Sequence, residues 1–410
     1  GSGGNARAIA RGTNEGASEV TVQARAQGGS GGLAFFADPL KAPVAGDGGS
    51  AEVEAFGESL GGGWVTVIGN ANGGSASVGR GGSVRLVDAV GGATSGRLAL
   101  HQSALGGESY PGIGGDAESR LSHVDEDGGA LELLADAYAG AGRAGGGDAV
   151  AAARGVGRDD VIVGVSAWAG SATGADASSG RARIDEAYGE SLGGGRVDVG
   201  AALGKGSGRS MATESREASA EAPLDAIVDN IVSGRTTGVL ALSQWARGGS
   251  AIGDAAGPGS IVRAGSALNR LDRRVSASRL EVSLGATGGT GVWAFEPVRA
   301  PSDGGNASIV ARLANETGGV FFEGAARGGD GGLGASFAHG GDASLDVEIE
   351  TRGDGADILF DSSFPIRGGD SDLYGTSAGG TAGNAVGRSV ATALGDSAVE
   401  VFDQAAGGQG

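Results

Sequence analysis

The sequence predicts an all-β fold, an elongated parallel β-solenoid of about eleven coils, because two patterns repeat along it. The first pattern is a motif, EAFGESLGGGWVTV at residues 54–67, which returns as EAYGESLGGGRVDV at residues 186–199 with eleven of fourteen residues identical. The copies lie 132 positions apart (186 − 54), which is four times 33. Between them, Gly-Gly pairs recur 33, 33 and 32 residues apart, at Gly48-Gly49, Gly81-Gly82, Gly114-Gly115 and Gly146-Gly147.

The second pattern is a short run in each repeat with large or branched apolar residues at alternate positions. Period-2 alternation places these residues on one face, which indicates strands rather than helices. Eleven such runs begin at Val20, Val65, Leu98, Leu131, Val161, Val197, Val239, Leu280, Val320, Ile358 and Val399.

A partner run rich in Ala and Val precedes many of these strands, and Gly-rich corners such as Gly61-Gly62-Gly63 join the two. Glycine permits the positive φ that tight corners require. The clearest partner runs span residues 51–56, 84–90, 182–188, 307–313 and 343–349. Each repeat is therefore predicted to be strand, turn, strand and a longer connection, and the whole chain a single repeat domain over residues 1–410.

An antiparallel sandwich or hairpin array is the alternative packing. The solenoid is favoured because stacking like on like requires equivalent residues at equivalent positions, and because Ala, Val, Gly and Leu suit a narrow interior. Eleven hairpins would also be many strands for one sandwich.

Two stretches interrupt the pattern and are predicted to be short helical insertions. In residues 210–234, Leu224, Ile227, Val228 and Ile231 follow a helical period, with Pro223 at a plausible first position and Gly234 as a stop. The second is the charged stretch SALNRLDRRVSAS at residues 266–278.

Composition limits the function classes. The chain holds 88 glycines in 410 residues, about three times the ordinary share, and carries a formal charge of −19. Such an acidic surface makes nucleic acid and anionic membranes unfavourable partners, and no apolar run is long enough to span a bilayer. Without cysteine there is no thiolate metal site, thiol catalysis or disulfide.

The sequence offers few candidates for chemistry. Calcium prefers six to eight oxygen ligands in Asp-rich loops, so Asp354, Asp357, Asp370 and Asp372 are the candidate calcium ligands. The carboxylate runs at Asp159-Asp160 and at residues 125–127 have no supporting cluster of basic or aromatic residues, and the four tryptophans occur singly. We therefore predict that the chain is not an enzyme.

The Gly-Gly-[Ser/Asp]-Ala openings at residues 48–51, 114–117, 146–149 and 340–343 and the GESLGGG turns resemble those of secreted, Gly/Ala-rich repeat proteins of Gram-negative bacteria. Those proteins are surface or matrix components, so the resemblance implies an extracellular or cell-surface structural role and no residue-level site.

Neither terminus shows a capping segment, and uncapped solenoid ends can pair with another subunit. We therefore expect a mature, secreted chain that self-assembles end to end into a filament or matrix fibre. The alternatives are a β-helical protein that binds or degrades polysaccharide and a monomeric adhesin stalk.

Overall fold

The computed structural model describes residues 1–32, 46–174, 177–208, 224–251, 262–291, 302–332, 338–362, 365–371 and 380–410. The chain forms two compact units, Gly1–Ala201 and Ala202–Gly410. Every assigned element of the described residues is a β-strand. None of these residues forms a helix that could span a membrane. The prediction of a single repeat domain stays a prediction.

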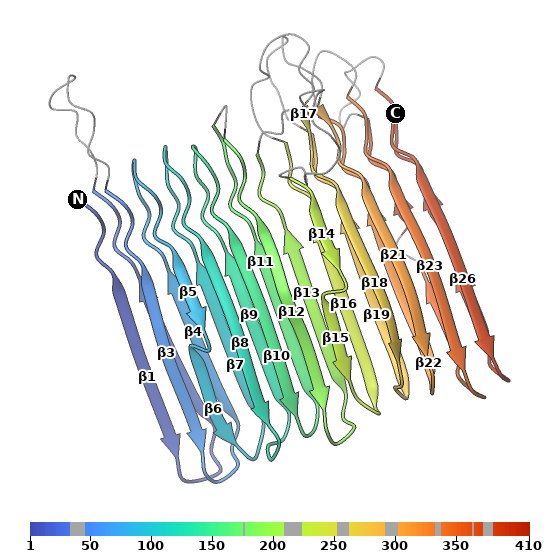
Figure 1. Ribbon diagram of the computed structural model, residues 1–410, viewed down its shortest axis with the longest axis horizontal. Coiled ribbons are helices and arrows are strands. Elements are labelled where there is room, and N and C mark those ends of the chain that lie inside the picture. Colours follow the sequence, from blue (N-terminus) through green and yellow to red (C-terminus); the bar gives the residue numbers. More distant parts are fainter. Residues whose placement is uncertain are drawn as a thin grey trace. The chain divides into compact units, whose positions relative to one another are not determined.

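In each unit the coils have the same plan: a first strand, a tight turn and a second strand that joins a different sheet (Figure 1). The first strands of unit 1 are β1 (Ala6–Asn14), β3 (Ala51–Ser59), β5 (Val84–Val87) with β6 (Val90–Thr94), β8 (Ala117–Asp125), β10 (Ala149–Gly157) and β12 (Ala182–Ser191). Its second strands are β2 (Val20–Gln27), β4 (Val65–Asn72), β7 (Leu98–Leu105), β9 (Leu131–Tyr138), β11 (Val161–Trp168) and β13 (Val197–Gly204).

Unit 2 repeats the plan. Its first strands are β14 (Ala226–Asp229) with β15 (Val232–Arg235), β18 (Ala267–Val275), β21 (Ala307–Asn315), β23 (Ala343–Arg352) and β26 (Ala385–Leu394). Its second strands are β16 (Val239–Arg247), β19 (Arg279–Thr287), β22 (Gly319–Arg327), β24 (Ile358–Asp361) and β27 (Val399–Phe402). The short strands β17 (Val262–Arg263), β20 (Ser302–Asp303), β25 (Ile366–Arg367) and β28 (Ala405–Ala406) extend the coils.

Like strands of successive coils pair in parallel and in register, which confirms the predicted parallel β-solenoid of about eleven coils. In unit 1, Val20 of β2 lies opposite Val65 of β4, and in unit 2 Ala307 of β21 lies opposite Ala343 of β23. All eleven predicted apolar runs lie in second strands. The alternative of an antiparallel array is wrong.

The core lies between the two sheets of each unit and consists mainly of Ala, Val, Leu and Ile. Alternation is nearly complete, as in β2, where every second residue is buried. Burying one valine, leucine or isoleucine side chain stabilises the fold by about 1.5–3 kcal/mol.

The repeated GESLGGG motif forms the turn between the strands of a coil. A Cβ at Gly57 would lie 2.9 Å from side-chain atoms of Val65 and Val67, so glycine makes room for the branched pair opposite. Ser59 is buried, accepts a hydrogen bond from Gly63 N at 2.9 Å and donates one to Gly16 O at 3.2 Å. Ser191 repeats these contacts with Gly195 N and Arg158 O.

Glycine has one role in the corners and another in the Gly-Gly pairs, and the positive φ predicted for the corner at residues 61–63 occurs at Gly62. Among described glycines, positive φ occurs only at Gly62, Gly194, Gly353, Gly355 and Gly395, all of them in turns. The paired glycines form a ladder of backbone hydrogen bonds. Its members come alternately from the segment that follows a second strand and from the segment that precedes a first strand. Its backbone N–H groups donate in sequence, Gly49 to Gly29 O, Gly74 to Gly49 O and Gly82 to Gly74 O, each at 2.8 Å.

This glycine ladder continues through the rest of unit 1, and unit 2 has its own. In unit 1 it proceeds through Gly107, Gly115, Gly140, Gly147, Gly170 and Gly180. In unit 2 it comprises Gly249, Gly265, Gly289, Gly305, Gly329, Gly341, Gly369, Gly383 and Gly408. A Cβ on these glycines would lie within about 2 Å of a carbonyl oxygen of a neighbouring segment, as at Gly82, where the distance to Gly49 O is 2.0 Å.

Both predicted helical insertions are wrong where the structure describes them. Residues 267–275 form strand β18, and Ala226–Asp229 forms strand β14, in which Val228 is buried while Ile227 is 38% exposed. Residues 210–223 of the predicted insertion lie outside the described residues.

The first strand breaks once in each unit, and a buried glutamine repairs each break. Between β5 and β6, the side chain of Gln102 accepts from Ala89 N at 3.1 Å and donates to Arg120 O at 2.9 Å. Between β14 and β15, Gln244 accepts from Ile231 N at 2.9 Å and Val232 N at 3.0 Å. Each amide thus satisfies backbone groups that the broken strand leaves buried.

Substitution of Gly115 by alanine tests the glycine ladder. The new Cβ would lie 2.1 Å from Gly82 O, so backbone must move, and we expect a loss of about 3 kcal/mol in the free energy of unfolding. Gly4→Ala is the matched control, because its Cβ would have nothing within 4 Å. Urea unfolding followed by circular dichroism measures both. Equal midpoints for the two variants would contradict the proposed packing.

Candidate functional site

The predicted calcium ligands lie in two separate parts of unit 2. Asp354 and Asp357 lie in the turn between β23 and β24, while Asp370 follows β25; Asp372 lies outside the described residues. The described residues contain no group of three or more His, Asp or Glu side chains placed to hold a metal. Calcium binding stays a prediction.

Each of the three described aspartates accepts a backbone hydrogen bond from the next coil. Asp354 accepts from Asp396 N at 3.1 Å, Asp357 from Ala398 N at 2.8 Å and Asp370 from Gln409 N at 2.7 Å. The same contact precedes the first strands of unit 1, where Asp116 accepts from Asp148 N at 2.9 Å and Asp148 from Arg181 N at 2.7 Å. These carboxylates therefore link adjacent coils.

The carboxylate runs considered for catalysis have similar structural partners. Asp160 accepts from Arg196 N at 2.7 Å, and Asp125 accepts from Gly128 N at 2.9 Å within its own turn.

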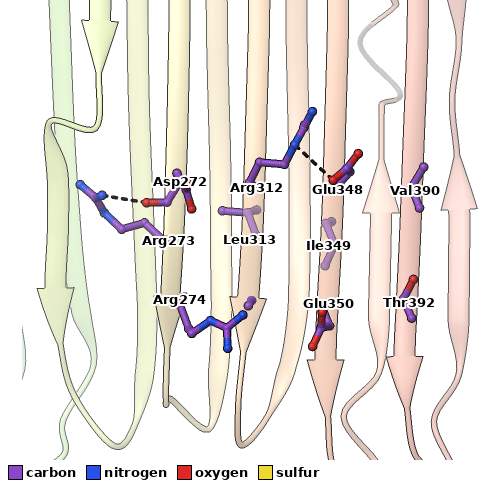
Figure 2. A pocket seen from close by; sticks show the side chains of 11 residues that line it. Asp272, Arg273, Arg274, Arg312, Leu313, Glu348, Ile349, Glu350, Val390 and Thr392 are labelled. Carbon is purple, nitrogen blue, oxygen red and sulfur yellow. Dashed lines mark hydrogen bonds and ion pairs between the residues drawn. The ribbon is translucent and has the colours of Figure 1, made fainter.

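An open hollow with charged walls lies on the sheet formed by β18, β21, β23 and β26. Figure 2 shows Arg274, Arg312, Glu348 and Glu350 around it. The remaining lining residues are Asp272, Arg273, Leu313, Ala314, Ile349, Val390 and Thr392. Its floor lies at Ala314, whose small side chain stands between larger neighbours in the sheet.

Ion pairs between adjacent coils dominate this charged face. Arg312 contacts Asp346 at 2.6 Å and Glu348 at 3.2 Å, and Arg388 of the next coil contacts the same two carboxylates at 2.7 and 2.9 Å. The hydrogen bond from Arg312 holds the pKa of Asp346 below its usual range; burial opposes this shift and Arg388 adds to it. Asp346 is therefore ionised at neutral pH and is no proton donor there.

The side chain of Arg273 donates hydrogen bonds to the backbone of the preceding coil. Its guanidinium donates to Val232 O at 3.0 Å and to Asn230 O at 2.7 Å, which satisfies carbonyls at the break between β14 and β15. Burial lowers the pKa of Arg273, while the charges of Asp272 and Asp229 raise it. The hollow thus combines paired charges with two arginines, Arg273 and Arg312, that also donate to backbone carbonyls, an arrangement that links neighbouring coils.

Sequence reasoning did not single out Arg312, Asp346 and Arg388 as a group. In the parallel register, Asp346 lies opposite Val310 of the preceding coil and opposite Arg388 of the following coil. Residues one coil apart become neighbours only once the register is known.

Comparison with known proteins adds no assignment: no family model, no curated protein and no solved structure matches the chain.

The role of Asp357 can be separated from calcium binding. Asp357→Ala removes the acceptor for Ala398 N, and we expect a loss of about 0.5–1.5 kcal/mol in unfolding free energy. The loss should be the same in calcium and in chelator, measured by urea unfolding. Glu323→Ala is a control in the same unit. A loss seen only in calcium would instead support the calcium prediction.

The Asp346 ion pairs predict a pH dependence. A carboxylate whose folded pKa is depressed adds stability above its unfolded pKa of about 3.9, and this is lost as pH falls through the folded value. Because Asp346 is 38% exposed, we expect Asp346→Asn to cost no more than about 1 kcal/mol at pH 7.

The difference from wild type should shrink as the pH falls below about 3.9. Urea midpoints between pH 2 and pH 7 measure it, with Glu323→Gln as the control. A difference that stays constant over this range would rule out an electrostatic origin.

Proposed function

We propose that the chain is a non-catalytic structural protein of the cell surface or extracellular space that self-assembles, coil on coil, into a filament or matrix fibre. The support is the way one coil binds the next. Each coil presents one edge of its two strands to the preceding coil and the opposite edge to the following coil, in parallel register. A surface that binds its own repeat in this head-to-tail manner can propagate without closing.

The observation that carries the proposal is a set of exposed core positions on β27. Val399 and Val401 are 45% and 44% exposed, although they lie in register with Ile358 and Phe360, which are each 1% exposed. Valines at core positions gain stability when another coil covers them. A coil of the same design has the matching strand edge and apolar side chains, and our proposal is that a second copy of the chain provides such a coil.

Hydrogen bonds from backbone N–H groups to side chains of the previous coil also support the proposal. Backbone N–H groups meet side-chain acceptors of the previous coil at Asp342, which receives Asn384 N at 2.7 Å, and at Asn306, which receives Asp342 N at 2.9 Å. Side-chain acceptors stand at the equivalent position of further coils, at Asn5, Ser83, Asp116, Asp148, Asp225 and Ser266, so a coil from another copy would find similar donors and acceptors there.

Substitution of Val401 by lysine tests self-assembly. A charge at a core position would have to be buried when a further coil stacks, so we expect filaments to disappear. Val386→Lys is the control, because Val386 is 61% exposed but lies opposite Ser344 on the outer face. Negative-stain electron microscopy and sedimentation velocity measure the outcome. Discrete particles from the wild-type protein would favour a monomeric stalk, and equal loss in both variants would point to a nonspecific charge effect.

A further inference from the structure

The outer face of the second strands in unit 1 carries an apolar and aromatic row that the structural role does not use. Leu105, Tyr138 and Trp168 end the strands β7, β9 and β11 and lie opposite one another in the parallel register. Leu105 is 37% exposed and Tyr138 39% exposed, and Trp168 is half-buried. Neighbouring parallel strands are about 4.8 Å apart, so the row runs for about 10 Å from coil to coil.

Amides continue this row on the two preceding coils. Asn72 of β4 lies opposite Leu105, and Gln27 of β2 lies opposite Asn72. The row therefore changes from hydrogen-bonding amides to an apolar and aromatic surface within one line across five coils.

A second row, two residues earlier on each strand, consists of Arg25 on β2 followed by small polar groups and one carboxylate. Ser103, Asp136 and Ser166 lie opposite one another, and Asn70 precedes them on β4. Burial raises the pKa of Asp136, while the hydrogen bond with Ser166 and the charge of His101 lower it. Burial also raises the pKa of Tyr138, as does the charge of Asp136, and the hydrogen bond with Ser166 lowers it. Asp136, Ser166 and the Tyr138 hydroxyl therefore lie close enough to affect one another's ionisation.

Three other titratable groups near these rows contact one another. His101 Nε2 lies 3.1 Å from Glu132 Oε1, and Arg97 also forms an ion pair with Glu132. The chain as a whole carries a charge of −19, which disfavours an anionic ligand.

We propose that Leu105, Tyr138 and Trp168, with the polar row beside them, form a binding site for a neutral polysaccharide laid across the coils. Sugar rings have apolar C–H faces that stack on aromatic rings, and hydroxyl groups at their rims. The row offers ring and leucine surface for those faces, while Asp136, Ser103, Ser166 and the amides offer partners for the hydroxyls. Exposed apolar patches rimmed by polar groups of this kind mark binding surfaces.

A ligand of this class fits better than a protein partner. A stable protein interface needs about 800 Å² from each partner with a desolvated apolar centre. Here the apolar surface is one side chain wide and polar residues line its edge, which suits a thin, hydroxyl-rich chain. The site does not require self-assembly, since all its residues belong to unit 1.

Affinity electrophoresis of the full chain in gels containing a soluble neutral β-glucan, dextran, galactomannan or anionic alginate tests the proposal. We expect retardation by at least one neutral polymer and none by alginate. Tyr138→Ala and Trp168→Ala should each weaken binding about tenfold, which corresponds to about 1.4 kcal/mol. Trp64→Ala is the matched control and should bind as wild type, because Trp64 is 58% exposed but lies outside the row, with Arg97 5.5 Å above its ring.

Tyr138→Phe and Ser166→Ala keep the proposal testable if an alanine variant fails to fold. The phenylalanine variant retains the stacking face and should bind within about twofold of wild type, whereas Ser166→Ala should bind more weakly. No retardation by any neutral polymer, retardation by alginate alone, or equal loss in the Trp64 variant would overturn the proposal. So would a loss of self-association in the Tyr138 and Trp168 variants without a change in polysaccharide binding.

Discussion

Close approach of backbone to backbone along the glycine ladders is the constraint on which the rest of each unit depends. Where the two non-strand segments of a coil meet, no side chain fits, because a Cβ at Gly74 or Gly140 would lie within about 2 Å of a carbonyl oxygen. This narrow part holds the two sheets of the coil at a separation that Ala, Val and Leu fill. Larger rings also fit at one place, where Phe322 and Phe360 of adjacent coils are buried and stack with ring centroids 5.1 Å apart.

The glycine ladders also provide hydrogen-bond partners for the backbone groups of the segments that lie between the strands. In a parallel sheet each strand bonds to its neighbours on either side, but the glycine segments bond alternately across the coil and to the next coil. Every turn of the chain thereby adds the same set of bonds. The first strand breaks at Asp88 and at Asn230, both of which have positive φ. At these breaks Gln102 and Gln244 of the second strands accept backbone hydrogen bonds, and Arg273 of the next coil donates to a backbone carbonyl.

The strand positions could be predicted from the sequence because alternation and period are read directly from the order of residues. The fold class and all eleven second strands follow from them. The failure at residues 266–278 has a physical cause. Inward positions of β18 include Asn269, which is fully buried, and Arg273, which bonds to backbone carbonyls of the broken strand. Two polar residues at core positions hide the alternation that would have indicated a strand.

The role of the paired glycines was also beyond sequence reasoning, because glycine serves both positive φ and close approach, and only the three-dimensional structure separates the two. Side-chain groups on the outer faces were missed for a related reason. Leu105, Tyr138 and Trp168 are 33 and 30 residues apart (138 − 105 and 168 − 138), and taken one by one they look unremarkable. Alignment of each repeat on its second strand would have placed them in one line.

The groups that determine how coils stack differ from the side chains on the outer face of the second strands. Backbone ladders, buried glutamines and the alternating core determine how coils stack, and they involve almost none of the outward side chains of the second strands. Those side chains vary from coil to coil, from Gln27 through Asn72 to Trp168, without any change in register. A repeat protein of this design can therefore vary the residues of one outer row while its stacking surfaces stay the same, so the proposed filament and the proposed polysaccharide site are compatible with one solenoid.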